Sequence, residues 1–225
     1  MPYQTTRKTR VLLTGFGPFP GVPVNASAEL ARELAEAANR AFPGVEVVAA
    51  YLPTEWAEGR SELRGLLKRL APDIALHFGV SERARGFEIE ARAKNRCEAS
   101  LDDSGQMIEA GELEADAPDQ HLAGIGARRV VENLRQAGLP AFLSRDAGGY
   151  LCNAVFYHSL TLANMASAEG SAGHQAGFIH IPVSLADARR WPHRPATPLS
   201  WRQAMQGGLI ILATCLGTKA RIPST

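Results

Sequence analysis

The sequence is poor in cysteine, has almost no net charge and contains no long apolar run. Three cysteines in 225 residues, without regular spacing, exclude a disulfide framework and are typical of a reducing compartment. A formal net charge of +1 offers no excess of either sign for binding nucleic acid or an anionic membrane. The sequence also lacks the apolar run of about 18 residues that spans a bilayer and the apolar segment of a signal peptide. We therefore expect a cytoplasmic protein that binds neither nucleic acid nor membranes.

What the sequence does contain is an alternation of short apolar runs with segments of helical periodicity. The runs at 11–14, 45–52 and 74–80 predict buried strands, and apolar residues recur at helical spacing in the segments between them. This alternation is typical of an α/β protein whose mostly parallel sheet is covered on both faces. We expect residues 1–225 to form a single three-layer α/β/α domain with a twisted central sheet.

The stretch from 87 to 137 departs from this alternation. Residues 87–93, F-E-I-E-A-R-A, alternate apolar and polar side chains, which predicts a half-exposed strand or hairpin arm beside the main sheet. Residues 95–118 follow no period and are rich in acidic residues and glycine, so a long loop or flap is expected there. A helix is predicted from about 119 to 137. The domain should therefore carry an added hairpin or flap.

Cys152 is the first candidate for chemistry. It follows the pair Gly148 and Gly149, and a helix is predicted to begin at about Asn153. A thiol at the first turn of a helix meets the positive end of the helix dipole and unpaired backbone N–H groups, which favour a thiolate and can form an oxyanion hole. Free cysteines are more often small core residues, as we expect for Cys215 in an apolar helix. The glycine turn favours a nucleophile at Cys152.

A cysteine nucleophile needs a base, and the base needs a group that orients it. His180 lies near the C-terminal end of the predicted strand G-F-I-H, and open α/β sheets bind their ligands at that edge. His77 lies inside an apolar run, which favours a hydrogen-bonded core histidine. Two carboxylates could orient the base, Glu88 and Glu90, on the polar face of the alternating strand.

Four motifs together resemble the pyroglutamyl peptidase I family, the pyrrolidone-carboxylate peptidases, which are cysteine exopeptidases. The motifs occur in the family's order between Leu13 and Pro182, and each is weaker evidence than the set. They read L-T-G-F-G-P-F-P-G-V-P-V-N-A-S, F-E-I-E-A-R-A-K-N, S-R-D-A-G-G-Y-L-C-N-A-V-F-Y and A-G-F-I-H-I-P.

The resemblance implies a role for each matching residue. Cys152 would be the nucleophile, His180 the general base and then acid, and Glu90 the carboxylate that orients His180. The pocket would hold an uncharged pyrrolidone ring against apolar and aromatic side chains. Phe16 and Phe19 match the paired aromatics that hold this ring, and Tyr150 and Leu151, beside the nucleophile, would add apolar wall.

The expected activity is removal of an N-terminal pyroglutamyl residue from small, N-terminally blocked peptides through a thioester. The resemblance implies that no metal or organic cofactor is needed. It also implies that the protein forms a homo-oligomer, namely a homotetramer. The sequence departs from the family after H-F-G, where V-S-E-R-A-R-G replaces a Q-A-G-G-R-like turn, and at Ala91, where an arginine is usual. These departures leave two alternatives open, a divergent amidohydrolase or a non-catalytic binding relative on the same fold.

Overall fold

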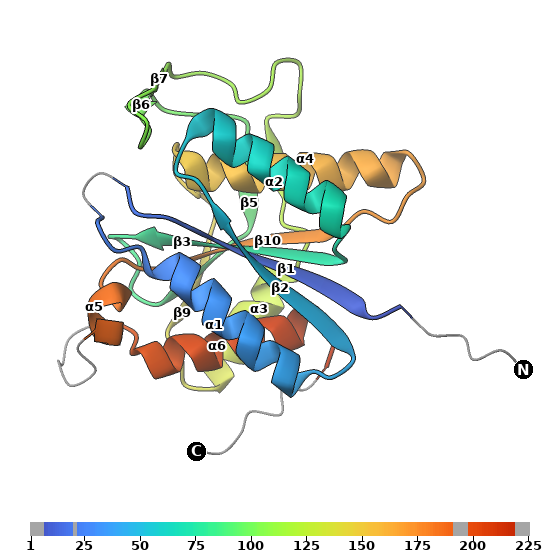
Figure 1. Ribbon diagram of the computed structural model, residues 1–225, viewed down its shortest axis with the longest axis vertical. Helices are drawn as coiled ribbons and strands as arrows, with labels where there is room; N and C mark the ends of the chain where they lie inside the picture. Colours follow the sequence, from blue (N-terminus) through green and yellow to red (C-terminus); the bar gives the residue numbers. More distant parts are fainter. Residues whose placement is uncertain (1–6, 20–21, 191–197, 219–225) are drawn as a thin grey trace, which may run out of the picture.

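A six-stranded sheet forms the centre of the computed structural model, which describes residues 7–19, 22–190 and 198–218 (Figure 1). Its strands are β1 (Thr9–Phe16), β2 (Val45–Leu52), β3 (Ile74–Ser81), β4 (Phe87–Glu90), β9 (Ala141–Ser144) and β10 (Gln175–Pro182). They lie in the order β2-β1-β3-β10-β4-β9. The first four strands in this order are parallel, whereas β4 is antiparallel to β10 and parallel to β9. The sheet is therefore mostly parallel, as predicted.

Helices cover both faces of this sheet, which confirms the predicted three-layer α/β/α architecture (Figure 1). They are α1 (Ala26–Ala41), α2 (Trp56–Leu70), α3 (Ala127–Gln136), α4 (Leu151–Ala168), α5 (Leu185–Arg190) and α6 (Trp201–Cys215). Side chains of α1, α3 and α6 share one buried apolar cluster with the sheet, and side chains of α2 and α4 share another. The near-continuous apolar runs of the central strands are explained by this burial on two sides.

The caps of two helices follow from their flanking residues. The Asn25 side chain accepts a hydrogen bond from the backbone N–H of Ser27 and so caps α1. Ser200 and Gln203 form a reciprocal capping box at the start of α6. The start of α4 is different, because no side chain caps it. Its first backbone N–H groups thus remain available to a ligand.

Two predictions about the middle of the chain are wrong. The segment at 87–93 is no arm beside the sheet, because β4 lies inside the sheet between β10 and β9. The helix predicted from about 119 begins only at Ala127, since β8 (Gln120–Leu122) pairs with β5 (Arg92–Lys94) and takes up the first part of that segment. The apolar residues there were read with a helical period, but a tertiary strand pairing decides their conformation.

The segment predicted to be a flap projects from the α2 and α4 side of the molecule (Figure 1). It contains a short antiparallel pair, β6 (Ser100–Leu101) and β7 (Met107–Ile108). The turn between these strands is tied to the body, because the Asp102 carboxylate accepts a hydrogen bond from the backbone N–H at the start of α2 (3.0 Å). The hydroxyl of Tyr150 donates to the Leu101 carbonyl oxygen at 3.2 Å. The predicted flap is therefore an anchored hairpin over one end of the sheet.

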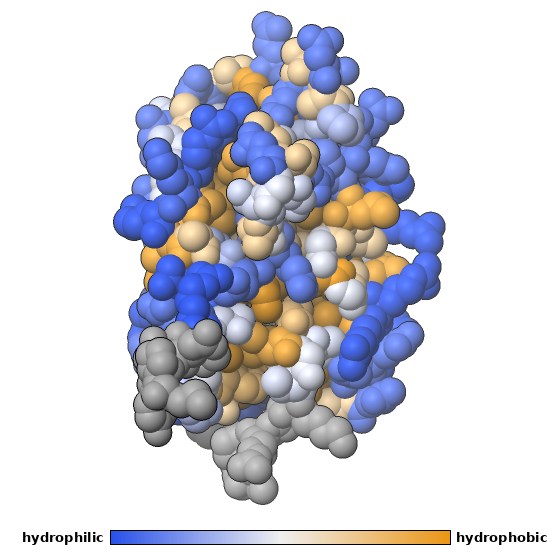
Figure 2. Space-filling view, turned by 90° about the vertical axis from the view of Figure 1, so that its right-hand side faces the viewer, coloured by the Kyte–Doolittle hydropathy of each residue, from blue (hydrophilic) through white to orange (hydrophobic). Residues whose placement is uncertain are grey.

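The surface is mixed in polarity. Figure 2 shows one face, on which polar side chains surround smaller areas of exposed apolar side chains. Of the helices in the described part of the chain, none has the length and apolar character needed to cross a membrane.

Candidate active site

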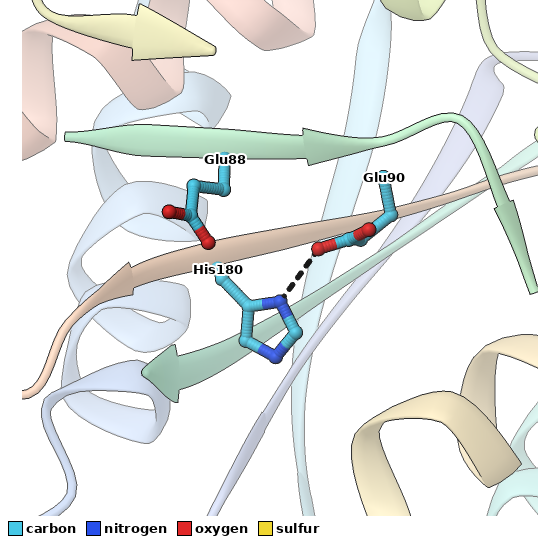
Figure 3. Close-up of side chains that lie close together, drawn as sticks. All are labelled: Glu88, Glu90 and His180. Atoms are coloured by element: carbon cyan, nitrogen blue, oxygen red, sulfur yellow. Dashed lines mark hydrogen bonds and ion pairs between the residues drawn. The ribbon is translucent and has the colours of Figure 1, made fainter. Parts of the chain in front are cut away.

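The site forms where β10 and β4 run side by side beneath the start of α4. His180 on β10 lies directly opposite Glu88 on β4 in the antiparallel register. Glu90 follows two residues later, so both carboxylates project from the same face of the sheet as His180 (Figure 3). Cys152 lies in the first turn of α4, which covers that face. Four side chains from three elements are thereby brought to one place.

His180 and Glu90 form a buried pair. The Nδ1 atom of His180 lies 2.9 Å from Oε1 of Glu90 (Figure 3). His180 is 6% exposed and Glu90 is fully buried. This bond fixes the orientation of the imidazole and leaves its second nitrogen, Nε2, free to face the thiol. Of the two carboxylates that the sequence offered as orienting groups, Glu90 makes the bond.

The pKa of His180 reflects a balance between burial and the interactions of the imidazole with its two neighbours. Burial by itself disfavours the charged imidazolium, but hydrogen bonds and charge interactions with Cys152 and Glu90 outweigh burial and raise the pKa of His180 to about 10. This environment favours the cationic form of His180. An imidazolium beside a sulfur atom stabilises a thiolate by charge.

The sulfur of Cys152 packs against Gly79 of the sheet, where the absence of a side chain leaves room for it. Gly79 on β3 lies directly opposite His180 in the parallel register with β10. A Cβ atom at this position would lie 2.9 Å from Cys152 Sγ and 2.8 Å from the ring of Phe178, both closer than real contacts allow. Any larger residue at position 79 would push the thiol away from the imidazole.

A glycine turn carries the chain into α4. Gly148 has a φ of +86°, a left-handed conformation that L side chains rarely adopt, and its backbone N–H donates to the carboxylate of Asp146 at 3.2 Å. The turn places the uncapped N-terminus of α4 beside Cys152. The helix dipole and the free N–H groups therefore favour negative charge at this point.

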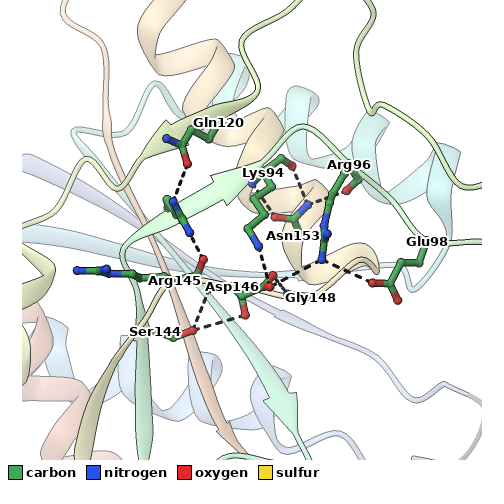
Figure 4. Close-up of polar contacts among 10 residues, drawn as sticks. Lys94, Arg96, Glu98, Gln120, Ser144, Arg145, Asp146, Gly148 and Asn153 are labelled. Carbon is green, nitrogen blue, oxygen red and sulfur yellow. Dashed lines mark hydrogen bonds and ion pairs between the residues drawn. The ribbon is translucent and has the colours of Figure 1, made fainter.

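A polar network holds this turn against β5 (Figure 4). The side chain of Asn153 accepts a hydrogen bond from Lys94 N at 2.9 Å and donates to the carbonyl oxygens of Lys94 at 2.8 Å and Arg96 at 2.9 Å. The ammonium group of Lys94 lies 2.7 Å from the carboxylate of Asp146. Asn153 is fully buried, so these bonds satisfy all of its amide groups inside the protein. The network fixes the helix start relative to the strand that follows Glu90.

Cys152 and His180 open into a cavity of about 530 Å³. The four residues predicted to form the apolar pocket all line it: Phe16, Phe19, Tyr150 and Leu151. The ring centroids of Phe19 and Tyr150 lie 6.4 Å apart. The Tyr150 ring also makes an edge contact with Trp56, at 5.3 Å between centroids. One end of the cavity is thus an aromatic cup formed by Phe16, Phe19 and Tyr150, and the flap contacts this cup through the bond from Tyr150 to Leu101.

Several parts of the site were not found in the sequence. Trp56 supports the cup, Asn153 fixes the nucleophile turn, and Asp102 anchors the flap. A signal existed for Asn153, because it directly follows Cys152 within the recognised motif. Trp56 and Asp102 carry no local signal, since each acts through a partner distant in the chain.

The same residues include the one group of potential metal ligands identified in the described ranges. Ligand atoms of Glu88, Glu90 and His180 lie within 4.8 Å of one another (Figure 3). The bond between His180 Nδ1 and Glu90 already occupies one ligand atom of each residue. The arrangement therefore fits an orienting pair better than a metal site.

The comparisons with known proteins agree with the motifs. The profile of the pyroglutamyl peptidase family matches residues 9–202. A pyrrolidone-carboxylate peptidase of Gloeobacter violaceus is 38% identical over 192 residues, which cover 85% of this chain and 90% of that protein. One of Pyrococcus furiosus is 32% identical over 174 residues, covering 77% and 80%. The crystal structure of pyrrolidone carboxyl peptidase from Pyrococcus furiosus superposes with a TM-score of 0.79 and 27% identity, covering 93% of this chain and 99% of that one.

Proposed function

Because the chain belongs to the pyroglutamyl peptidase family, we propose that it is a cysteine exopeptidase that removes an N-terminal pyroglutamyl residue from peptides. The observation that carries the proposal is the 2.9 Å bond between His180 Nδ1 and the buried Glu90, with Cys152 on the other side of the same imidazole. A nucleophile, a base and an orienting carboxylate form the arrangement that acyl transfer requires.

The reaction proceeds in two steps. The Cys152 thiolate attacks the carbonyl carbon that joins the pyroglutamyl group to the next residue, and His180 gives its proton to the departing amine, so that the C–N bond breaks and a thioester forms. His180, now neutral, takes a proton from water. The resulting hydroxide attacks the thioester, releasing pyroglutamate and restoring the thiolate and imidazolium pair.

The start of α4 stabilises the tetrahedral intermediate of each step. Its first N–H groups have no side-chain cap, and that of Cys152 is adjacent to the sulfur that carries the acyl group. Donors fixed in this way need no reorganisation when negative charge develops on the carbonyl oxygen. The backbone N–H of Cys152 is the oxyanion donor in this proposal.

The aromatic cup receives the pyrrolidone ring. This ring is an uncharged lactam, so an apolar wall excludes water without leaving a charge unpaired. Phe16, Phe19 and Tyr150 give the cavity an apolar wall for the ring, whereas a free N-terminal ammonium group against that wall would lose hydration without gaining a counter-ion from it. This cost explains a preference for blocked N-termini.

The proposal extends to the domain organisation, the cellular location and the oligomeric state of the enzyme. The continuous sheet, with a buried cluster on each face, supports one domain over residues 1–225. The three unpaired cysteines support a reducing, cytoplasmic environment. Family resemblance supports a homo-oligomer, a tetramer, and the solution mass from light scattering tests it.

The test of the activity uses a pyroglutamyl amide of a fluorescent amine. Replacing Cys152→Ala removes the nucleophile and should lower kcat/KM by about a thousandfold or more, while the fold is retained. Cys215→Ala is the matched control, because Cys215 is half-buried in α6 on the opposite side of the sheet and should leave the rate unchanged. Iodoacetamide should modify Cys152 faster than Cys97 or Cys215 near neutral pH. Full activity of the Cys152→Ala protein would contradict the proposal.

A further inference from the structure

The cavity above Cys152 has two unlike halves. The aromatic cup forms one, and charged side chains line much of the other. Four of these are carboxylates and two are guanidinium groups: Glu82, Glu88, Glu98, Asp146, Arg83 and Arg96. A pyrrolidone ring in the cup has no use for these charges. These charged side chains would face the second residue of the peptide, which follows the pyroglutamyl ring.

His180 identifies the side on which the leaving residue lies. In the proposed reaction the imidazole gives its proton to the departing amine, so the second residue of the substrate begins next to His180. Glu88 is the residue directly opposite His180 across the strand pair, and it lines the cavity, whereas Glu90 is buried (Figure 3). The carboxylate of Glu88 is therefore the nearest negative charge to the leaving residue that is open to the cavity.

We propose that Glu88 makes the enzyme prefer peptides in which lysine or arginine follows the pyroglutamyl residue. This inference rests on the proposed function of the same site. The long side chain of lysine or arginine extends from the leaving amine past His180 to the Glu88 carboxylate. A glutamate in that position would instead meet Glu88 and Glu82 with the same sign of charge.

The Glu88 carboxylate forms no ion pair with a lysine or arginine among the described residues, although the positive charges of His180, Arg85 and Arg83 act on it. Burial raises the pKa of Glu88, and the charge of His180 only partly offsets that effect. A half-buried carboxyl group of this kind gains more from a cation than a fully hydrated one, because its own hydration is already incomplete.

Two other carboxylates that line the cavity, those of Glu98 and Asp146, are already paired with basic side chains. The guanidinium of Arg96 lies 3.7 Å from the carboxylates of both Glu98 and Asp146, and the ammonium of Lys94 lies 2.7 Å from Asp146 (Figure 4). These pairs leave less negative charge to attract a substrate. Of the two remaining carboxylates, those of Glu82 and Glu88, Glu88 lies directly opposite His180, so we assign the selecting charge to Glu88.

The experiment compares three substrates with wild-type and variant enzyme. They are otherwise identical amides of pyroglutamyl-lysine, pyroglutamyl-norleucine and pyroglutamyl-glutamate, which differ only in the charge at the end of the second side chain. We expect kcat/KM to fall in that order. Glu88→Gln should reduce the ratio of the lysine to the norleucine substrate about three- to tenfold, and Glu88→Lys should favour the glutamate substrate. Raising the salt concentration should reduce the wild-type ratio.

Each ratio is measured within one protein preparation, so partial unfolding of a variant cancels from it. Glu98→Gln is the matched control, with the same substitution at one of the paired carboxylates, and its ratio should stay within about twofold of wild type. Equal effects of Glu88→Gln and Glu98→Gln would contradict the assignment to Glu88. Hydrolysis of all three peptides at equal rates would overturn the inference alone. No hydrolysis of any of them by the wild-type protein would overturn the proposed function and this inference with it.

Discussion

His77 and His180 are both buried histidines on neighbouring strands, β3 and β10, yet their environments drive their protonation in opposite directions. Burial lowers the pKa of His77 to about 3, with a further contribution from His174. The hydrogen-bond partners of His77 among the described residues are two hydroxyl groups, that of Thr14 at 2.7 Å and that of Ser159 at 3.0 Å. His180 is just as enclosed, but its bonds to Cys152 and Glu90 raise its pKa to about 10. Neutral partners satisfy an imidazole, whereas anionic partners keep it charged.

A third histidine shows that a carboxylate partner alone is not sufficient. His158 on α4 lies 3.0 Å from Glu114, a pair similar in length to that of His180 and Glu90. Burial lowers the pKa of His158 to about 4, helped by the positive charges of Arg60 and Arg64. Arg60 also binds Glu114 at 2.8 Å and so shares its negative charge. The two pairs differ in two ways: the cations Arg60 and Arg64 oppose protonation of His158, whereas Cys152 is a second partner that favours protonation of His180.

The largest effect is expected from removing the charge of Glu90, which tests whether an anionic partner keeps His180 protonated. Glu90→Gln keeps the size of the side chain but should bring the pKa of His180 down, because burial is then opposed by Cys152 alone. We expect kcat/KM for a pyroglutamyl amide to fall by about a hundredfold to ten-thousandfold. The rate is measured across pH.

Glu114→Gln is the matched control for that experiment. It makes the same change in the other histidine and carboxylate pair, which contacts no part of the cavity above Cys152. Its activity should remain close to wild type. A Glu90→Gln protein as active as the Glu114→Gln protein would show that Glu90 does not act through His180.

The opposite pKa shifts predict opposite effects of pH on stability. The folded pKa of His77 lies below its unfolded value near 6.5, so its contribution is present above pH 6.5 and is lost as the pH falls toward about 3. The folded pKa of His180 lies above the unfolded value, so its contribution is full below pH 6.5 and is lost as the pH rises through about 10. Chemical denaturation across this range measures both.

The two histidines can be separated by the same substitution. His77→Gln should flatten the loss of unfolding free energy between pH 6.5 and 4 by up to about 1.4 kcal/mol per pH unit, whatever its effect on the absolute stability. His180→Gln should leave this acid limb unchanged and flatten the alkaline one. Identical acid limbs in wild type and His77→Gln would show that His77 is not held neutral by the fold.

The smallest expected effect concerns the pair of His158 and Glu114. Arg60→Gln removes one of the cations that oppose protonation and frees Glu114 for the histidine, so the pKa of His158 should rise from about 4. The histidine ring protons report this pKa in an NMR titration. Arg32→Gln on α1, whose guanidinium binds only glutamates of its own helix among the described residues, serves as the control. A fall in the pKa of His158 on loss of Arg60 would contradict the explanation.

The strands and helices of the sheet were largely predictable because their signals are local. The apolar run at 45–52 coincides with β2, and that at 74–80 falls short of β3 by one residue. The prediction failed where a segment takes its conformation from a distant partner, as in β8, which pairs with β5. It also misplaced β4, since alternating polarity normally means one exposed face, whereas here the polar face carries the half-buried Glu88 and the buried Glu90 and contributes to the site.

The sequence alone indicated the α/β fold class and the glycine turn before Cys152, and its resemblance to a family motif pointed to His180 and Glu90 as candidates. These features depend on residue order, on periodicity and on glycine, which act over a few residues. Only the tertiary structure shows that Glu90 is buried against His180 while Glu88 opens to the cavity. The antiparallel register of β10 and β4 explains this difference, because it sets Glu88 beside the imidazole and lets Glu90 reach Nδ1 from the buried side. A strand register depends on both strands, and Glu90 and His180 are 90 residues apart in the chain, so no local sequence signal sets their contact.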